Sequence, residues 1–306
     1  MKVAVVGAGA MGSIFGARFA AGGHDTTLVD VSAPLVETIE RDGVVIVRDD
    51  EETTTHVPAT TDPDGLGPAD LVVFFVKCYH TDSAARLAQP LVGPDTIVAS
   101  LQNGWGNGDV LAQTFPAEQI VVGVTYNSGT VLDVGRVAHP GVGPTTVGAF
   151  EGGGDRAERV AEAIRDGGLD AEVAEPVRPE IWKKLVLNAA TLPTAALTGM
   201  NAGPLTAQAE MHELVSATAR EAVAAARALG YGIDADERVE YIHALLEKAG
   251  PAKASMLQDF EAGRRTEIDV INGAVVAAAD EHGVDVPLNR AFVALVAGWE
   301  TMRGLR

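Results

Sequence analysis

Three glycines with the spacing G-x-G-x-x-G stand near the start of the sequence, in Gly7-Ala-Gly9-Ala-Met-Gly12. They follow an apolar run at residues 3–6, short enough for a buried strand, and precede a segment at 13–21 that is typical of a helix. In this context Gly7 permits a tight turn, Gly9 lets a pyrophosphate approach the backbone, and Gly12 lets the helix pack closely on the strand. The helix N-terminus would then hold the phosphates. We therefore expect the cofactor to contact the whole loop: Gly7, Ala8, Gly9, Ala10, Met11 and Gly12. A Gly-rich turn without a ligand is the alternative.

An acidic residue, Asp30, ends the second predicted strand at 24–29, about 20 residues beyond the glycines. A carboxylate at this position can accept hydrogen bonds from the adenosine ribose and would repel a 2′-phosphate. The following residues 31–34 contain no Arg or Lys to hold that phosphate. The sequence therefore favours NAD over NADP. Asp30 could also cap the helix that follows it, and the two roles are compatible.

The second half of the chain carries a lysine and an asparagine, Lys184 and Asn188, four residues apart and so on one helical face. The residues between them are apolar, which indicates a mostly buried helix. A lysine that faces a cleft from such a helix can have its pKa lowered, which suits a general acid. On spacing alone, Lys183 and Lys184 could equally be solvated surface lysines.

Apolar runs that resemble buried parallel strands end at residues 76, 101, 124 and 150. Lys77 directly follows the first of these runs, and Asn103 lies two residues beyond the end of the second. Ligands of open α/β sheets lie beyond the carboxyl ends of the strands. We also expect residues 44–47 and 56–59 to pair around the acidic turn at 49–52. Beyond Pro179 the pattern is helical, with helices predicted at 181–197, 207–229, 238–248, 268–281 and 289–302.

This pattern predicts an α/β fold with an N-terminal Rossmann-type parallel sheet domain, residues 1–175, and an all-α C-terminal domain, residues 176–306. The single cysteine, Cys78, excludes an internal disulfide and fits a reducing compartment. With no basic leader and no long apolar span, the expected location is the cytoplasm. The net charge of −19 argues against nucleic acid and membrane partners. The seven histidines are scattered, so no metal site is expected.

Five segments, in this order, closely resemble the ketopantoate reductase (2-dehydropantoate 2-reductase) family over nearly the whole chain. They are the glycine loop, Val76-Lys77, Gln102-Asn103-Gly104, Trp182-x-Lys184-Leu185-x-x-Asn188, and Ser255-Met-Leu-Gln-Asp259 followed by Arg265-Thr266-Glu267-Ile268-Asp269-x-Ile271-Asn272-Gly273. The resemblance implies hydride transfer from a reduced nicotinamide to the ketone carbon of a small anionic 2-oxo acid.

The resemblance also implies roles for individual residues. Lys184 would protonate the forming alkoxide. Glu267 would be the acid that lines the cleft between cofactor and substrate, and we expect it to be both a catalytic and a cofactor-binding residue. Asn188 would hold the substrate, and Ser255 would hydrogen-bond its carboxylate. Lys77 and Asn103 would contact the nicotinamide ribose, and Asn103 would also face the substrate. Gly129 falls near the position of a backbone contact to the cofactor.

Three positions depart from the family pattern. Leu192 stands where an asparagine usually precedes the proline of the lysine helix, and Ala202 aligns with a second substrate asparagine unless Asn201 replaces it. Trp105 stands where a smaller apolar residue is usual. Fewer polar groups favour a more apolar substrate. The chain is therefore expected to reduce ketopantoate, with an NAD-dependent D-2-hydroxyacid dehydrogenase of the mandelate type as the alternative. A non-catalytic dinucleotide sensor would not need Lys184. The apolar helical domain makes a homodimer the expected assembly.

Overall fold

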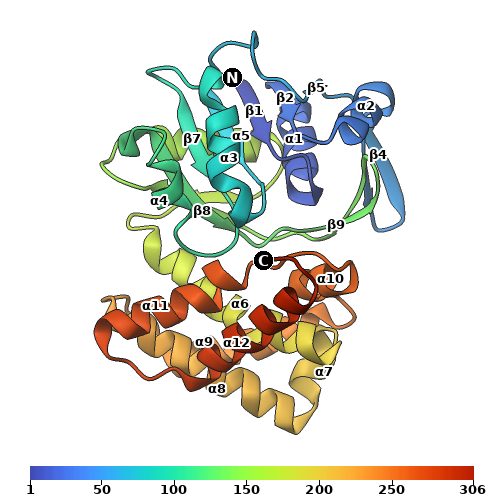
Figure 1. The fold of residues 1–306 in the computed structure, drawn as a ribbon. Helices are drawn as coiled ribbons and strands as arrows, with labels where there is room; N and C mark the ends of the chain where they lie inside the picture. Colours follow the sequence, from blue (N-terminus) through green and yellow to red (C-terminus); the bar gives the residue numbers. More distant parts are fainter. The chain divides into compact units, whose positions relative to one another are not determined.

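The computed structural model describes all residues from 1 to 306, which form two compact units (Figure 1). The first unit comprises residues 1–102 and 107–177, and the second comprises residues 103–106 and 178–306. The short loop 103–106 therefore groups with the helices, although its neighbours in sequence belong to the sheet unit. This assignment matters for the site because Asn103 lies in the loop.

The first unit is organised around an eight-stranded sheet with the order β12-β11-β8-β7-β6-β1-β2-β5. All neighbouring strands run parallel except β11, which is antiparallel to β8. From β5 to β8 this is the strand order of dinucleotide-binding folds, with its switch point between β1 and β6. The bounds are β1 (Lys2–Val6), β2 (Asp25–Val29), β5 (Ala59–Thr60), β6 (Leu71–Phe74), β7 (Ile97–Ser100), β8 (Ile120–Thr125), β11 (Thr145–Ala149) and β12 (Ala171–Val173).

A second, four-stranded sheet has the order β4-β3-β10-β9. Its hairpin corrects a prediction: β3 pairs with residues 51–55, not with 56–59. The reversal is confined to Asp49 and Asp50, both with positive φ, so the next two acidic residues already belong to the returning strand. Strands β9 and β10 were not predicted. The bounds are β3 (Val44–Arg48), β4 (Glu51–Thr55), β9 (Ser128–Asp133) and β10 (Arg136–Gly141).

Five α-helices complete the first unit, and α1 packs on β1, β2 and α5. Their bounds are α1 (Ala10–Ala21), α2 (Ala33–Asp42), α3 (Thr81–Leu87), α4 (Asn107–Leu111) and α5 (Arg156–Asp166). The central strand β6 is buried along its whole length. Its continuous apolar sequence is therefore that of a strand covered on both faces, as predicted from the run at 71–76.

The second unit is helical and is arranged around α6 (Arg178–Thr198), which contacts α7, α8, α10 and α12. The predicted helix at 207–229 corresponds to α8, which begins after Gln208, a residue with extended backbone. The helix predicted at 268–281 begins only at Asn272, and α7 was not predicted. The bounds are α7 (Ala202–Ala207), α8 (Ala209–Ala228), α9 (Ala235–Ala249), α10 (Ser255–Glu261), α11 (Asn272–His282) and α12 (Pro287–Met302). No helix is both long enough and apolar enough to cross a membrane.

Helix α6 continues through Pro193, which has no N–H to donate to the carbonyl of Ala189, four residues earlier. The Asn272 side chain supplies the missing donor, with its Nδ2 2.9 Å from the Ala189 oxygen. The same amide donates to Asn289 Oδ1 at 3.0 Å. A buried asparagine from α11 therefore keeps α6 intact directly beside Asn188.

Candidate active site

The glycine loop joins β1 to α1 in a turn that the first and third glycines make possible. Gly7 has φ +95°, and a Cβ there would lie 2.9 Å from the backbone nitrogen of Val76. A Cβ on Gly12 would overlap the carbonyl oxygen of Gly7. Both positions therefore exclude a side chain, and the loop lies tightly against the end of the β6 segment.

The middle glycine has the opposite environment. No atom lies within 4 Å of a Cβ built on Gly9, the N-cap of α1, and no side chain caps this helix. The first N–H groups of α1 are therefore available to a ligand, and the backbone is open where a pyrophosphate would approach. These features fit a dinucleotide.

Asp30 supports this loop directly. One carboxylate oxygen accepts a hydrogen bond from the Ala8 N–H at 2.8 Å, and the other accepts from the Ser32 N–H at 2.9 Å. The second bond closes a turn just before α2, which has no side-chain cap at its N-terminus, and the first bond ties the end of β2 to the glycine loop. A carboxylate offers about four acceptor sites, so both bonds leave capacity for ribose hydroxyls.

Two further residues of the predicted cofactor set lie at this end of the sheet. A Cβ on Gly129 would lie 2.8 Å from Ile14 Cδ1 and 3.1 Å from the Cβ of Ala10, so β9 packs on the first turns of α1. Lys77 lies beyond the end of β6 and directly follows Val76, the residue against which Gly7 packs. The structure thus brings the glycine loop, Asp30, Lys77 and Gly129 together within the first unit.

A residue without an assigned role in the sequence, Gln102, organises the neighbouring strand ends. Its Nε2 donates to the Val76 carbonyl and to Thr81 Oγ1, each at 2.8 Å. Its Oε1 accepts from Ser100 at 2.9 Å. Gln102 belongs to the motif Gln102-Asn103-Gly104, and its buried amide fixes the end of β7 to the end of β6.

The chain then enters the helical unit through Gly104. This residue has φ +87°, and a Cβ there would lie 2.7 Å from the Val270 carbonyl oxygen. That carbonyl accepts from the Trp105 N–H at 2.8 Å. Only glycine fits this approach. Asn103 is therefore held on the segment that also carries Glu267, three residues before Val270.

Lys184 and Asn103 form the central contact of the second unit. The Lys184 Nζ donates to Asn103 Oδ1 at 2.7 Å. Burial lowers the pKa of Lys184 from 10.5 to about 8, and the nearby Glu267 carboxylate opposes this by raising it. A buried lysine with a pKa near neutrality can both donate and regain a proton, which is the property required of a general acid.

One face of α6 presents three positions at intervals of four residues: Lys184, Asn188 and Leu192. Asn188 and Leu192 are both buried. An asparagine at position 192 would thus extend the polar face, whereas leucine makes this end apolar. Ser255 is the half-buried first residue of α10, a helix that contacts α6. Asn103, Lys184, Asn188, Ser255 and Glu267 accordingly belong to one unit.

Trp105, the third departure from the family pattern, belongs to an aromatic cluster. Its ring lies 5.6 Å from that of Trp182 and 6.5 Å from that of Tyr231. The Arg178 guanidinium lies 6.0 Å from the Trp105 ring. Because Trp182 lies two residues before Lys184, the cluster braces the start of α6 that carries the lysine.

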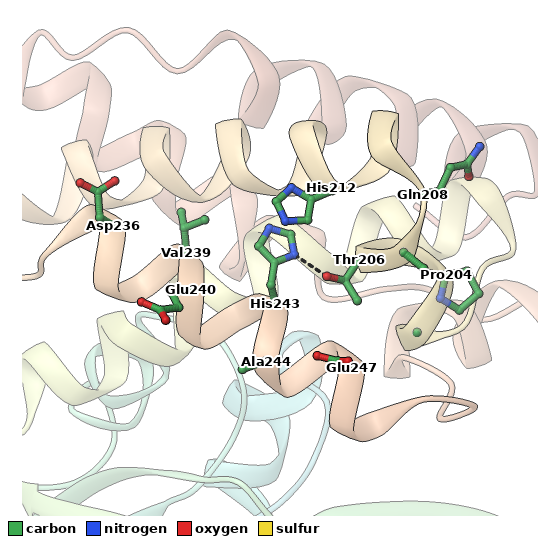
Figure 2. Close-up of a pocket in the computed structure, with 12 residues that line it drawn as sticks. Pro204, Thr206, Gln208, His212, Asp236, Val239, Glu240, His243, Ala244 and Glu247 are labelled. Atoms are coloured by element: carbon green, nitrogen blue, oxygen red, sulfur yellow. Dashed lines mark hydrogen bonds between the residues drawn. The ribbon is translucent and has the colours of Figure 1, made fainter.

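A separate hollow of about 1130 Å³ lies among α7, α8 and α9 (Figure 2). Its lining includes none of the predicted site residues. The rings of His212 and His243 stack there at 3.6 Å, and the His243 nitrogens bond Thr206 at 2.9 Å and Ser216 at 2.8 Å. Both nitrogens of His243 are thus engaged within the protein.

Family models match both halves of the chain. The model described as "Ketopantoate reductase PanE/ApbA" matches residues 3–152, and "Ketopantoate reductase PanE/ApbA C terminal" matches residues 176–300.

Curated relatives match over the full length. A 2-dehydropantoate 2-reductase from Halobacterium salinarum is 34% identical, covering 97% of this chain and 98% of the relative. A protein of the same name from Archaeoglobus fulgidus is also 34% identical, covering 98% of each chain.

Solved structures share the fold. A D-mandelate dehydrogenase with NADH and anilino(oxo)acetate has a TM-score of 0.93 at 26% identity and covers all of both chains. A 2-dehydropantoate 2-reductase from Geobacter metallireducens has a TM-score of 0.92 at 30% identity, covering 97% of this chain and 99% of the other.

Proposed function

This chain belongs to the ketopantoate reductase family of oxidoreductases, and we propose that it reduces ketopantoate to pantoate with NADH. The observation that carries the proposal is the hydrogen bond of Lys184 to Asn103, in a setting where burial lowers the lysine pKa to about 8. Glu267 lies close enough to act on the same ammonium electrostatically. A proton donor of matched acidity is thus held in a polar cluster.

The reaction adds one hydride and one proton across the ketone. A reduced nicotinamide, when bound, would supply the hydride for the carbonyl carbon. As the C=O π bond breaks, its electron pair moves to oxygen, and the Lys184 ammonium donates a proton there. The ammonium charge also stabilises the developing alkoxide before the proton moves. Lys184 ends neutral and regains its proton from solvent.

The other polar residues of the second unit would hold the substrate. We assign the Ser255 hydroxyl to the substrate carboxylate and the Asn188 amide to its polar oxygens. Asn103 has the additional task of orienting Lys184 through the 2.7 Å bond. Glu267 acts as a positioning acid that keeps the lysine charged. Alignment of this kind lowers the entropic part of the barrier.

The choice of NADH rests on Asp30. Its carboxylate is fixed by the Ala8 and Ser32 N–H groups, with capacity for the ribose hydroxyls. A 2′-phosphate at this position would meet a fixed negative charge, and Ser32 offers no cation to offset it. The D-mandelate dehydrogenase of similar structure was solved with NADH, which agrees with this choice.

A D-2-hydroxyacid dehydrogenase of the mandelate type is the second candidate. Leu192, buried on the face shared by Lys184 and Asn188, supports it, because leucine cannot hydrogen-bond a substrate hydroxyl. Ala202, where the family pattern has an asparagine, has the same effect. An apolar substituent on the 2-oxo acid would suit both positions.

The proposal extends to a cytoplasmic homodimer. The absence of a second cysteine to pair with Cys78 supports a reducing compartment. Sedimentation of the purified protein would measure its oligomeric state.

NADH and NADPH oxidation should be measured with ketopantoate, phenylglyoxylate and 2-oxoisocaproate in parallel. We expect the highest kcat/KM for ketopantoate with NADH. Preference for an apolar 2-oxo acid would indicate a D-2-hydroxyacid dehydrogenase of the mandelate type, with Leu192 and Ala202 as its specificity determinants. Binding of NADH without oxidation by any 2-oxo acid would indicate a sensor instead.

A further inference from the structure

A carboxylate that no family motif contains is buried in the last turn of α12. Glu300 is 0% exposed, which is rare for a glutamate unless its charge is paired. Its Oε2 accepts a hydrogen bond from Arg306 Nε at 2.7 Å. The guanidinium thus offsets the charge, and the second oxygen is turned toward another part of the unit.

The second oxygen of Glu300 binds one residue twice. Oε1 accepts from the Thr266 N–H at 2.7 Å and from the Thr266 hydroxyl at 2.6 Å. The Thr266 hydroxyl in turn accepts from the Ile268 N–H at 3.2 Å. These bonds fix the backbone on both sides of Glu267, the residue that lies between them.

A second arm of the network reaches the far side of the same segment. Arg306 Nη2 bonds Asp269 Oδ1 at 2.7 Å, and Arg265 bonds the other oxygen of Asp269 at 3.3 Å. The network of Glu300 thus continues through Arg306 and Asp269 to Arg265. Together they bracket residues 265–269 from both ends.

Helix α12 also holds the helix that starts at Ser255. The Trp299 ring, next to Glu300, stacks on Phe260 of α10 with centroids 3.8 Å apart and planes 5° apart. Adjacent residues of α12 therefore contact both segments to which the proposed function assigns substrate or acid roles.

We propose that Glu300 is a positioning residue, which acts through Thr266 to fix the Glu267 carboxylate beside Lys184. This inference rests on the proposed function for the reaction it serves, and on the hydrogen bonds of Glu300 and Thr266 for the geometry. Its support is electrostatic as well as geometric, because Glu267 raises the pKa of Lys184 against the effect of burial. A displaced Glu267 would leave that burial effect less opposed, so Lys184 would lose its proton at lower pH.

The variants that test this are Glu300→Gln and Thr266→Val, with Thr266→Ser as the rescue and the exposed Thr301→Ala as the control on the same helix. Thr266→Val removes both bonds of the hydroxyl, the one to Glu300 and the one from the Ile268 N–H, and keeps the side-chain volume. It therefore tests the idea even where Glu300→Gln does not fold. We expect kcat with the best 2-oxo acid to fall about tenfold, with a smaller change in KM. The alkaline limb of the kcat profile should move to lower pH in both variants. Thr266→Ser and Thr301→Ala should match the wild type.

A second readout does not depend on turnover. NMR of 13C-dimethylated lysines, with Lys184→Arg to assign the signal, gives the pKa of Lys184 in each variant. A lower value in Thr266→Val than in Thr266→Ser is the expected result. Equal values and an unmoved alkaline limb, with only a loss of thermal stability, would overturn the inference. Failure of the wild type to reduce any 2-oxo acid would overturn the proposed function instead, and the NMR comparison would still decide the role of Glu300.

Discussion

The two units carry their parts of the site in opposite ways. In the first, the candidate dinucleotide site is a continuous loop whose working groups are backbone N–H donors, shaped by Gly7, Gly9 and Gly12. In the second, the proposed working groups are side chains from segments far apart in sequence, such as Asn103, Lys184 and Glu267. A site built from backbone is encoded by where side chains are absent. A site built from side chains depends on what holds each segment.

The same contrast appears in the electrostatics. The chain has a net charge of −19, yet both proposed ligands are anions. The loop can meet a pyrophosphate with the free N–H groups of α1, which requires no cationic side chain. The helical unit instead uses one lysine, whose pKa is lowered by burial and partly restored by a carboxylate. Its function thus depends on a balance that mutations can shift.

The largest effect that we expect in the second unit is that of Lys184→Ala. Loss of the positioned acid should lower kcat by about a hundredfold or more, because the alkoxide would have neither a proton donor nor a compensating charge. Steady-state kinetics with saturating NADH would measure it. NADH affinity should be unchanged, since the loop and Asp30 belong to the other unit.

Lys184→Arg sharpens this result, because it keeps the positive charge and removes the accessible proton. An Arg variant as slow as the Ala variant assigns the effect to proton transfer, and an intermediate rate assigns part of it to charge. Near-normal turnover in Lys184→Ala would remove this residue from the acid role.

In the first unit, the corresponding variant combines Asp30→Ala with Ser32→Arg. The ribose would lose charge-assisted hydrogen bonds worth about 1.5–3 kcal/mol, roughly tenfold to a hundredfold in NADH affinity. The new guanidinium would favour a 2′-phosphate. The ratio of kcat/KM for NADH to that for NADPH should therefore fall, measured with one 2-oxo acid. Asp30→Ala alone serves as the control, and a wild type that prefers NADPH would refute the role of Asp30.

The regular parts of both units could be predicted from the sequence for physical reasons. Continuous apolar runs located β1, β6, β7 and β8, and the glycine spacing located the turn into α1. The β3–β4 hairpin was misplaced because its acidic residues suggested a longer turn, whereas two aspartates with positive φ suffice. Helix α7 was not predicted, because its six residues include Gly203 and Pro204, which are poor helix formers.

The supporting residues were harder to predict than the site residues. Gln102, Asn272 and Glu300 each bond a backbone group distant in sequence, and no local pattern announces such a partner. A signal existed for Asn272, because Pro193 leaves a carbonyl in α6 without its donor. For Glu300 the only signal was a carboxylate in an apolar helix, which is equally typical of a solvated face.

The glycine loop itself offers a smaller and cleaner test. A side chain on Gly9 meets no atom of the protein, so Gly9→Ala should leave the melting temperature unchanged while NADH binds about tenfold more weakly, or about 1.4 kcal/mol. Gly12→Ala is the matched variant, because its methyl group overlaps the Gly7 carbonyl and should destabilise the first unit as well. Calorimetric titration and thermal melts separate the two. Equal melting losses would mean that Gly9 is structural.

The smallest expected effect is a pH dependence of the reaction rate that NADH affinity should not share. Lys184 donates only when protonated, so reduction should be constant well below its pKa of about 8 and fall as pH rises through it, by about half between pH 7 and 8. The reverse reaction needs the neutral amine as base, so oxidation of the 2-hydroxy acid should rise over the same range. NADH affinity should stay flat, because the loop binds through N–H groups that do not titrate there. A reduction rate that is level to pH 9 while oxidation rises would mean that the proton comes from another group, and the balance between burial and Glu267 would then have no part in the chemistry.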